Sequence, residues 1–81
     1  MPRATVTDAV KLVLVEALRG SKCVNIHDVA RLAAELLGEL GVQARPEAIL
    51  KVAKSIVSKR GRELGACWAP GKPGTVCRCG W

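Results

Sequence analysis

The chain is poor in aromatic and amide side chains. It contains no Phe or Tyr, two Trp and one Met, and only Asn25 and Gln43 carry an amide. Proteins that bind single-stranded nucleic acid without sequence preference stack bases on aromatic rings. Since Trp68 is expected in the core and only Trp81 remains, the sequence argues against such a stacking platform. The scarcity of thermolabile side chains is typical of a protein from a thermophile.

Segments that would indicate catalysis or membrane insertion are also missing. No Gly-rich phosphate loop, H-E-x-x-H motif or pair of carboxylates in an apolar setting occurs. His27 is the single His, and no Asn or Asp is placed to complete a Cys-His arrangement. The sequence therefore predicts that the protein is not an enzyme and has no small-molecule substrate. Because no apolar run approaches roughly 18 residues and no signal-peptide pattern follows residues 1–3, we predict a cytoplasmic protein without a membrane partner.

The chain is rich in apolar residues and in positive charge. Hydrophobic residues make up 49% of it and charged residues 25%, which predicts one globular domain over residues 1–81. The net charge is +6. Acidic and basic side chains balance in residues 1–40, so residues 41–81 carry the whole excess. Such segregation indicates a polyanionic partner, most simply a nucleic acid.

Apolar periodicity predicts a first helix over residues 8–19, preceded by a flexible arm of residues 1–6. Thr7 is its expected N-cap. Leu12 and Val15 fall outside the apolar stripe that would face the core. Two interpretations remain open: these side chains form a homodimer contact, or a loop or the N-terminal arm covers them.

A short extended segment and a second helix follow. Val24 is expected to point inward, and Asn25 to cap a helix over about residues 26–40. Apolar positions spaced by three and four place one face of this helix in the core. That face consists of Val29, Leu32, Ala33, Leu36, Leu37 and Leu40.

A third helix, rich in Lys and Arg, is predicted from Pro46 to about residue 60. Proline at the first helical position and Glu47 in the first turn favour its start, and Gly61 favours its end. Its apolar side consists of Ile49, Val52, Ala53, Ile56 and Val57. The opposite side carries cations and small hydroxyls, which suit the major groove, where Lys and Arg bind phosphates or guanine edges. The alternative interpretation is a solvated helix surface.

Two short runs around a Pro/Gly turn predict a C-terminal β-hairpin. Residues 63–69 and 75–79 flank a P-G-K-P-G turn centred on Lys72. Folding the two runs symmetrically about Lys72 places Cys67 opposite Cys77. Lys72 then lies at the tip of the hairpin.

The order of helix, short strand, helix, turn, helix and hairpin, with the segment C-V-N-I-H-D-V-A-R-L-A-A-E-L-L-G, resembles the winged helix-turn-helix superfamily of DNA-binding domains. In that family a strand ends on an apolar residue, here Val24, and a cap such as Asn25 opens the second helix. The resemblance covers residues 7–81 and is closest to small domains of archaeal, hyperthermophile type. It implies an α+β, mainly α fold with three helices and a small antiparallel sheet, whose hairpin wing spans residues 62–81.

The resemblance also implies a function. The third helix, about residues 46–60, would enter the major groove of double-stranded DNA, and Lys72 on the wing would reach a neighbouring phosphate or the minor groove. The protein would be a small transcription regulator or nucleoid-associated protein. Its DNA-binding residues on or beside the third helix, here called the basic face, would be Arg45, Glu47, Lys51, Lys54, Ser55, Ser58, Lys59 and Arg62.

A second function remains open, because the family also includes modules that bind protein or RNA. The turn between the second and third helices, residues 38–45, is longer than in the simplest members. The alternative is a non-enzymatic subunit of a ribonucleoprotein or polymerase-type assembly. Such a subunit would use the same basic face on RNA or on an acidic protein.

The four cysteines carry a further set of alternatives. If the first strand pairs with the last, as in winged-helix sheets, all four side chains project from the sheet face away from the helices. This arrangement implies disulfides Cys67–Cys77 and Cys23–Cys79. A zinc site is the rival, although the spacing lacks paired C-x₂₋₄-C knuckles, and free thiols are the third possibility.

Overall fold

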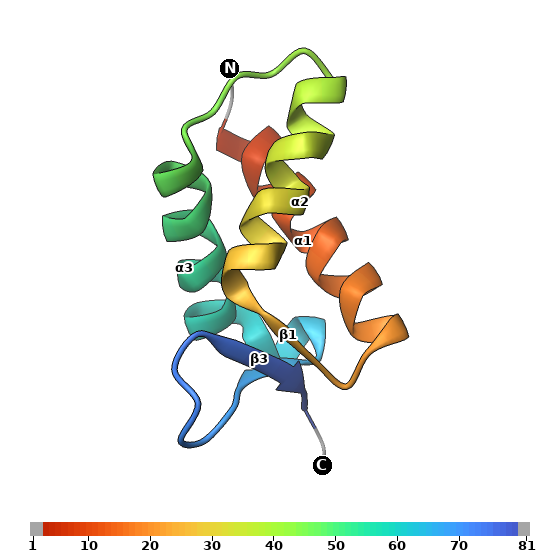
Figure 1. Ribbon diagram of the computed structural model, residues 1–81, viewed down its shortest axis with the longest axis vertical. Helices are drawn as coiled ribbons and strands as arrows, with labels where there is room; N and C mark the ends of the chain where they lie inside the picture. Colours follow the sequence, from red (N-terminus) through yellow and green to blue (C-terminus); the bar gives the residue numbers. More distant parts are fainter. Residues whose placement is uncertain (1–2, 80–81) are drawn as a thin grey trace.

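Three helices and a small antiparallel sheet make up the fold, as Figure 1 shows for this computed structural model. The structure describes residues 3–79, so Trp81 lies outside it. In chain order the elements are α1 (Arg3–Gly20), β1 (Cys23–Asn25), α2 (Ile26–Glu39), α3 (Pro46–Leu64), β2 (Ala66–Trp68) and β3 (Thr75–Arg78). The predicted α+β, mainly α architecture with a C-terminal hairpin is confirmed, and its layout is winged-helix-like.

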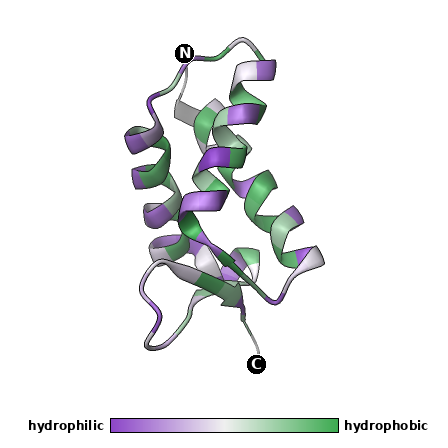
Figure 2. Cartoon of the chain, viewed as in Figure 1, coloured by the Kyte–Doolittle hydropathy of each residue, from purple (hydrophilic) through white to green (hydrophobic). Residues whose placement is uncertain are grey.

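The core lies where the three helices meet and extends down to the sheet. Figure 2 shows that hydrophobic residues are concentrated on the inner sides of the helices. The largest fully buried side chains are Leu14, Ile26, Leu37, Ile49, Val10, Val29 and Val76. Within the part of the chain that the structure describes, no helix is both long and apolar enough to cross a membrane.

Helix α1 begins earlier than predicted. It runs from Arg3, so residues 3–6 are helical rather than a flexible arm, and Thr7 lies inside the helix instead of capping it. Val6 packs against the core, and tertiary packing of this kind stabilises a helical turn that has no cap. Leu12 is 54% exposed, so the described chain does not cover it.

Helix α2 buries a different set of leucines from the predicted one. Asn25 caps it as expected, since its Oδ1 accepts the His27 amide at 2.8 Å. However, Leu32 and Leu40 are 42% and 61% exposed. The buried arc is centred on Ala33, about 100° from Leu32, and Leu40 is the C-cap beyond the last helical turn.

Helix α3 continues beyond its predicted end. Its backbone kinks at Arg60 (φ −130°, ψ 15°) and the helix ends at Leu64, with Gly65 in the left-handed conformation (φ 72°) as C-cap. Gly61 is buried, and a Cβ there would clash with the backbone carbonyl oxygen of Ala66. Gly61 therefore permits close packing of α3 against β2 rather than ending the helix.

The sheet has the predicted strand order, with β3 between β1 and β2. The predicted disulfide pairing, however, is wrong: the bonds are Cys23–Cys77 and Cys67–Cys79. Cys77 is in register with both Cys23 and Cys67, and it can bond only one of them. Because it bonds Cys23, Cys67 pairs diagonally with Cys79. No cysteine remains as a free thiol or as a zinc ligand.

Candidate nucleic-acid interface

Packing of α3 against the other two helices determines which side of it faces solvent. Pro46 occupies the first turn and Glu47 supplies an acidic charge at the positive end of the helix dipole. Ile49, Ala53 and Ile56 are buried against the core. The opposite side therefore points outward, as the sequence predicts.

Every residue of the basic face is exposed in the structure. Arg45 is the N-cap of α3 and uses no side-chain hydrogen bond in that role. The ion pairs among the described residues are Glu16–Arg19 and Asp28–Arg31, both outside α3. The α3 cations thus form no direct ion pair with carboxylates of the described chain and can contact an anionic partner.

The basic face extends beyond α3 on the side of α1. Lys51, Ser55 and Lys59, spaced by four residues, line a groove between α3 and α1 together with Lys11 and Arg60. Sequence reasoning missed Lys11, because it lies in the half of the chain with no net charge. Only the packing of α1 beside α3 joins it to the basic face.

Ser58 has a role that the sequence did not predict. Its Oγ accepts a hydrogen bond from Trp68 Nε1 at 3.1 Å, which connects α3 to strand β2. Trp68 is half-buried rather than fully enclosed in the core. Ser58 is therefore partly engaged within the protein, whereas Ser55 makes no such contact among the described residues.

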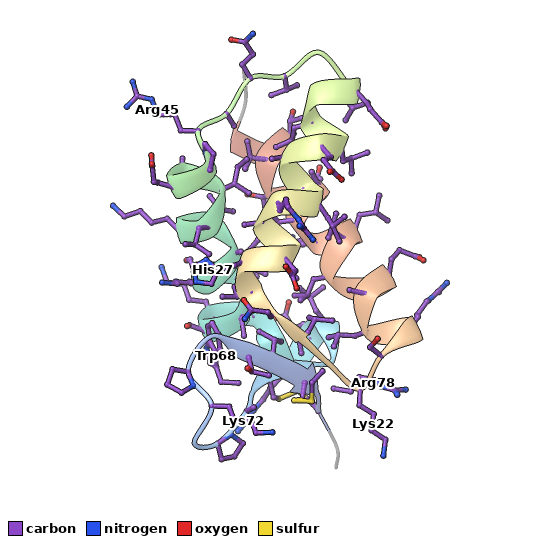
Figure 3. The ribbon with its side chains drawn as sticks, in the orientation of Figure 1. Lys22, His27, Arg45, Trp68, Lys72 and Arg78 are labelled. Atoms are coloured by element: carbon purple, nitrogen blue, oxygen red, sulfur yellow. A yellow bond between two sulfur atoms is a disulfide. The ribbon has the colours of Figure 1, made fainter. Side chains whose placement is uncertain are left out.

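Lys72 lies on the hairpin, far from Arg45 at the N-terminal end of the basic face. It borders a hollow beside the sheet with Lys22 and Arg78, and Cys23, Cys77 and Cys79 also line this hollow. Figure 3 shows these three cations at the end of the molecule opposite Arg45. Lys22 and Arg78 come together because the Arg78 amide donates to the Lys22 carbonyl oxygen at 2.9 Å. We call Lys22, Lys72 and Arg78 the hairpin cluster.

Comparisons of the chain with models of protein families, with curated proteins and with solved structures gave no match. The site must therefore be interpreted from its own geometry.

That geometry suits the binding of a long polyanion. At about 1.5 Å per residue the 19 residues of α3 span roughly 28 Å, so its cations can follow several consecutive phosphates. Among residues 3–79 no group of three or more side chains could hold a metal ion. The chemistry on this surface is that of exposed ammonium and guanidinium groups, which donate to phosphate oxygens.

Proposed function

We propose that the protein binds double-stranded DNA with α3 in the major groove, as a small transcription regulator or nucleoid-associated protein of winged helix-turn-helix type. One observation carries this proposal: α3 presents Arg45, Lys51, Lys54, Lys59 and Arg62 to solvent without ion pairs among the described residues, while its other side is fixed in the core. A rigid helix with cations along one side matches the width of the major groove.

The basic face supports a division of roles along α3. Arg45, Glu47 and Lys51 lie at its N-terminal end, the part of a recognition helix that contacts base edges in helix-turn-helix proteins. Lys54, Lys59 and Arg62 would then contact the DNA backbone. Glu47 also stabilises the helix start, whichever base it meets.

The hairpin cluster would provide a second backbone contact. The hairpin follows α3 directly through Gly65, so Lys72 would lie close to a duplex that α3 holds. Phosphate contacts of this kind add affinity and orientation without sequence preference.

We also propose that the protein works in the cytoplasm of a thermophile. The low content of Asn, Gln and Met supports this source. Two disulfides in an 81-residue chain are compatible with it, since intracellular proteins of hyperthermophiles are rich in disulfides.

A salt titration of binding to a random-sequence duplex tests the proposal. The logarithm of the binding constant should fall linearly with the logarithm of salt concentration. The variant Lys51→Ala/Lys54→Ala should reduce that slope by about two, one for each lost phosphate contact. As the control, Arg31→Ala removes an exposed charge from α2 and should leave the slope nearly unchanged.

Absence of duplex binding by the wild-type protein at low salt would contradict the proposal. So would a loss of about one in the slope of the α2 control, the share of a single charge, since binding would then follow net charge rather than α3. Preference for RNA over duplex DNA in the same titration would favour the alternative, a subunit of a ribonucleoprotein or polymerase-type assembly. Binding only to an acidic protein would do the same.

A further inference from the structure

The outer surface of α1 is apolar in the middle and charged at both ends. At about 100° per residue, Asp8, Leu12, Val15 and Arg19 fall within an arc of about 60°. Leu12 is 54% exposed, Val15 is half-buried, and the two charged side chains are exposed. Leu32 of α2, 42% exposed, lines the same groove as Leu12, so the apolar surface continues from α1 onto α2.

The order of these four side chains is self-complementary when the helix is reversed. Leu12 and Val15 are equidistant from the midpoint between residues 13 and 14, and so are Asp8 and Arg19. Two copies of α1 packed antiparallel about that midpoint therefore place Leu12 of one copy against the partner's Val15. The same register brings the Asp8 carboxylate of each copy to the guanidinium of the partner's Arg19.

We propose that the protein forms a two-fold symmetric homodimer through antiparallel packing of α1 against the partner's α1. Leu12 and Val15 form its apolar centre, and Asp8–Arg19 pairs close both ends. In a two-fold interface the same surface patch of both copies makes each contact twice. In the single chain the Arg19 guanidinium lies 3.5 Å from the Glu16 carboxylate of the same helix. An exposed ion pair of this kind adds little stability, so exchanging it for the partner's Asp8 costs little.

Charge selects the antiparallel arrangement over a parallel one. Parallel packing would place Asp8 beside the partner's Asp8 and Arg19 beside the partner's Arg19, and like charges brought together disfavour such an interface. Glu16 and Lys11 lie at the edges of the α1 surface. The two Lys11 side chains of the dimer, and likewise the two Glu16 side chains, therefore stay in solvent. Salt screens the repulsion between them beyond about 10 Å.

The dimer has a consequence for the two flanks of α1. Its two-fold axis is perpendicular to both α1 helices, so each flank lies on the same side of the dimer in both copies. Lys11 borders the α3 flank with Lys51 and Lys59, whereas Glu16 borders the α2 flank with Glu35. Both α3 helices thus lie on one side of the dimer. The use of that side for DNA rests on the proposed function; the dimer itself does not.

Sedimentation equilibrium without DNA tests the dimer. The chain of 8.6 kDa should show a concentration-dependent mass that rises to twice this value. Leu12→Lys places a charge at the apolar centre and should weaken association by at least about tenfold. Leu40→Lys changes a leucine that is 61% exposed but lies outside the α1 surface, and this matched control should leave association unchanged.

Charge exchange tests the register. Asp8→Arg and Arg19→Asp each bring like charges together twice in the antiparallel dimer, and each should weaken association about tenfold. The double variant Asp8→Arg/Arg19→Asp restores opposite charges and should return the dissociation constant to within about threefold of wild type. Circular dichroism of each variant checks that α1 remains helical, because Arg19 also lies in its last turn.

Three outcomes would overturn the proposal. A mass of 8.6 kDa at every concentration up to about 1 mM would exclude the dimer. Association unaffected by Leu12→Lys would exclude this surface of α1. Single charge changes without effect would exclude the antiparallel register, since a parallel dimer keeps like charges at both ends in every variant. Because no measurement includes DNA, failure of the dimer is distinguishable from failure of DNA binding.

Discussion

The helical part of the molecule and its small sheet are stabilised in different ways. The helices contribute most of the fully buried side chains, such as Leu14, Leu37 and Ile49, and each stabilises the fold by about 1.5–3 kcal/mol. The strands are three or four residues long, and sheets of that size are marginal by themselves. Two disulfides cross the sheet instead.

The same difference applies to the elements that carry the two groups of cations, the basic face and the hairpin cluster. The basic face is carried by a helix whose position depends on apolar burial, whereas the hairpin cluster depends on cross-links between short strands. Besides the shared core, two of the contacts that link α3 to the hairpin can be changed singly: the close approach of Gly61 to Ala66, and the hydrogen bond from Trp68 to Ser58. Substitutions that remove the disulfides or these contacts would show how far the stability of the sheet depends on that of the helices.

Removal of the disulfides should have the largest effect. Cys23–Cys77 joins residues 54 apart and Cys67–Cys79 joins residues 12 apart, so loop closure predicts about 4 and 3 kcal/mol of stabilisation. The stabilisation from each disulfide is measured by guanidinium unfolding of the variants Cys23→Ala/Cys77→Ala and Cys67→Ala/Cys79→Ala. Losses below about 1 kcal/mol in each variant would mean that burial alone holds the sheet.

Gly61→Ala tests the packing of α3 against the sheet. The new Cβ would press on the Ala66 carbonyl, so α3 and β2 must move apart, at a cost of about 1–3 kcal/mol in the free energy of unfolding. Gly38→Ala is the matched control, because Gly38 is also helical but has nothing within 4 Å of a Cβ. That variant should be about 0.5–1 kcal/mol more stable than wild type. Equal effects of the two changes would refute the close packing at Gly61.

Local sequence signals predicted much of this architecture. Pro46, Glu47 and the apolar spacing were enough to place α3 and the side of it that faces solvent, because helix starts and amphipathic faces are encoded within a few turns. The P-G-K-P-G turn likewise determined the hairpin register, which the structure confirms by pairing Cys67 with Cys77 across the strands.

The strand order was predicted, but other features that depend on contacts between distant segments were not. The register places Cys77 opposite two cysteines, so sequence could not choose between Cys23 and Cys67. The hairpin cluster exists only because β1 pairs with β3 and brings Lys22 next to Arg78. Its third member, Lys72, is predicted from the sequence to reach a neighbouring phosphate or the minor groove, and the structure places it beside Lys22 and Arg78.

The smallest expected effect concerns Ser58, which sequence reasoning assigned to DNA. Its hydroxyl already accepts from the Trp68 indole at 3.1 Å, and Ser58→Ala would remove that bond at a cost of about 0.5 kcal/mol, since the site is exposed. Ser55→Ala removes a hydroxyl from the same helix that makes no such bond, and it should leave stability unchanged or slightly raised. The proton resonance of the Trp68 indole N–H should shift in the first variant only. A shift in both variants, or in neither, would argue against the hydrogen bond. A loss of DNA affinity in Ser58→Ala but not in Ser55→Ala would instead show that Ser58 contacts DNA.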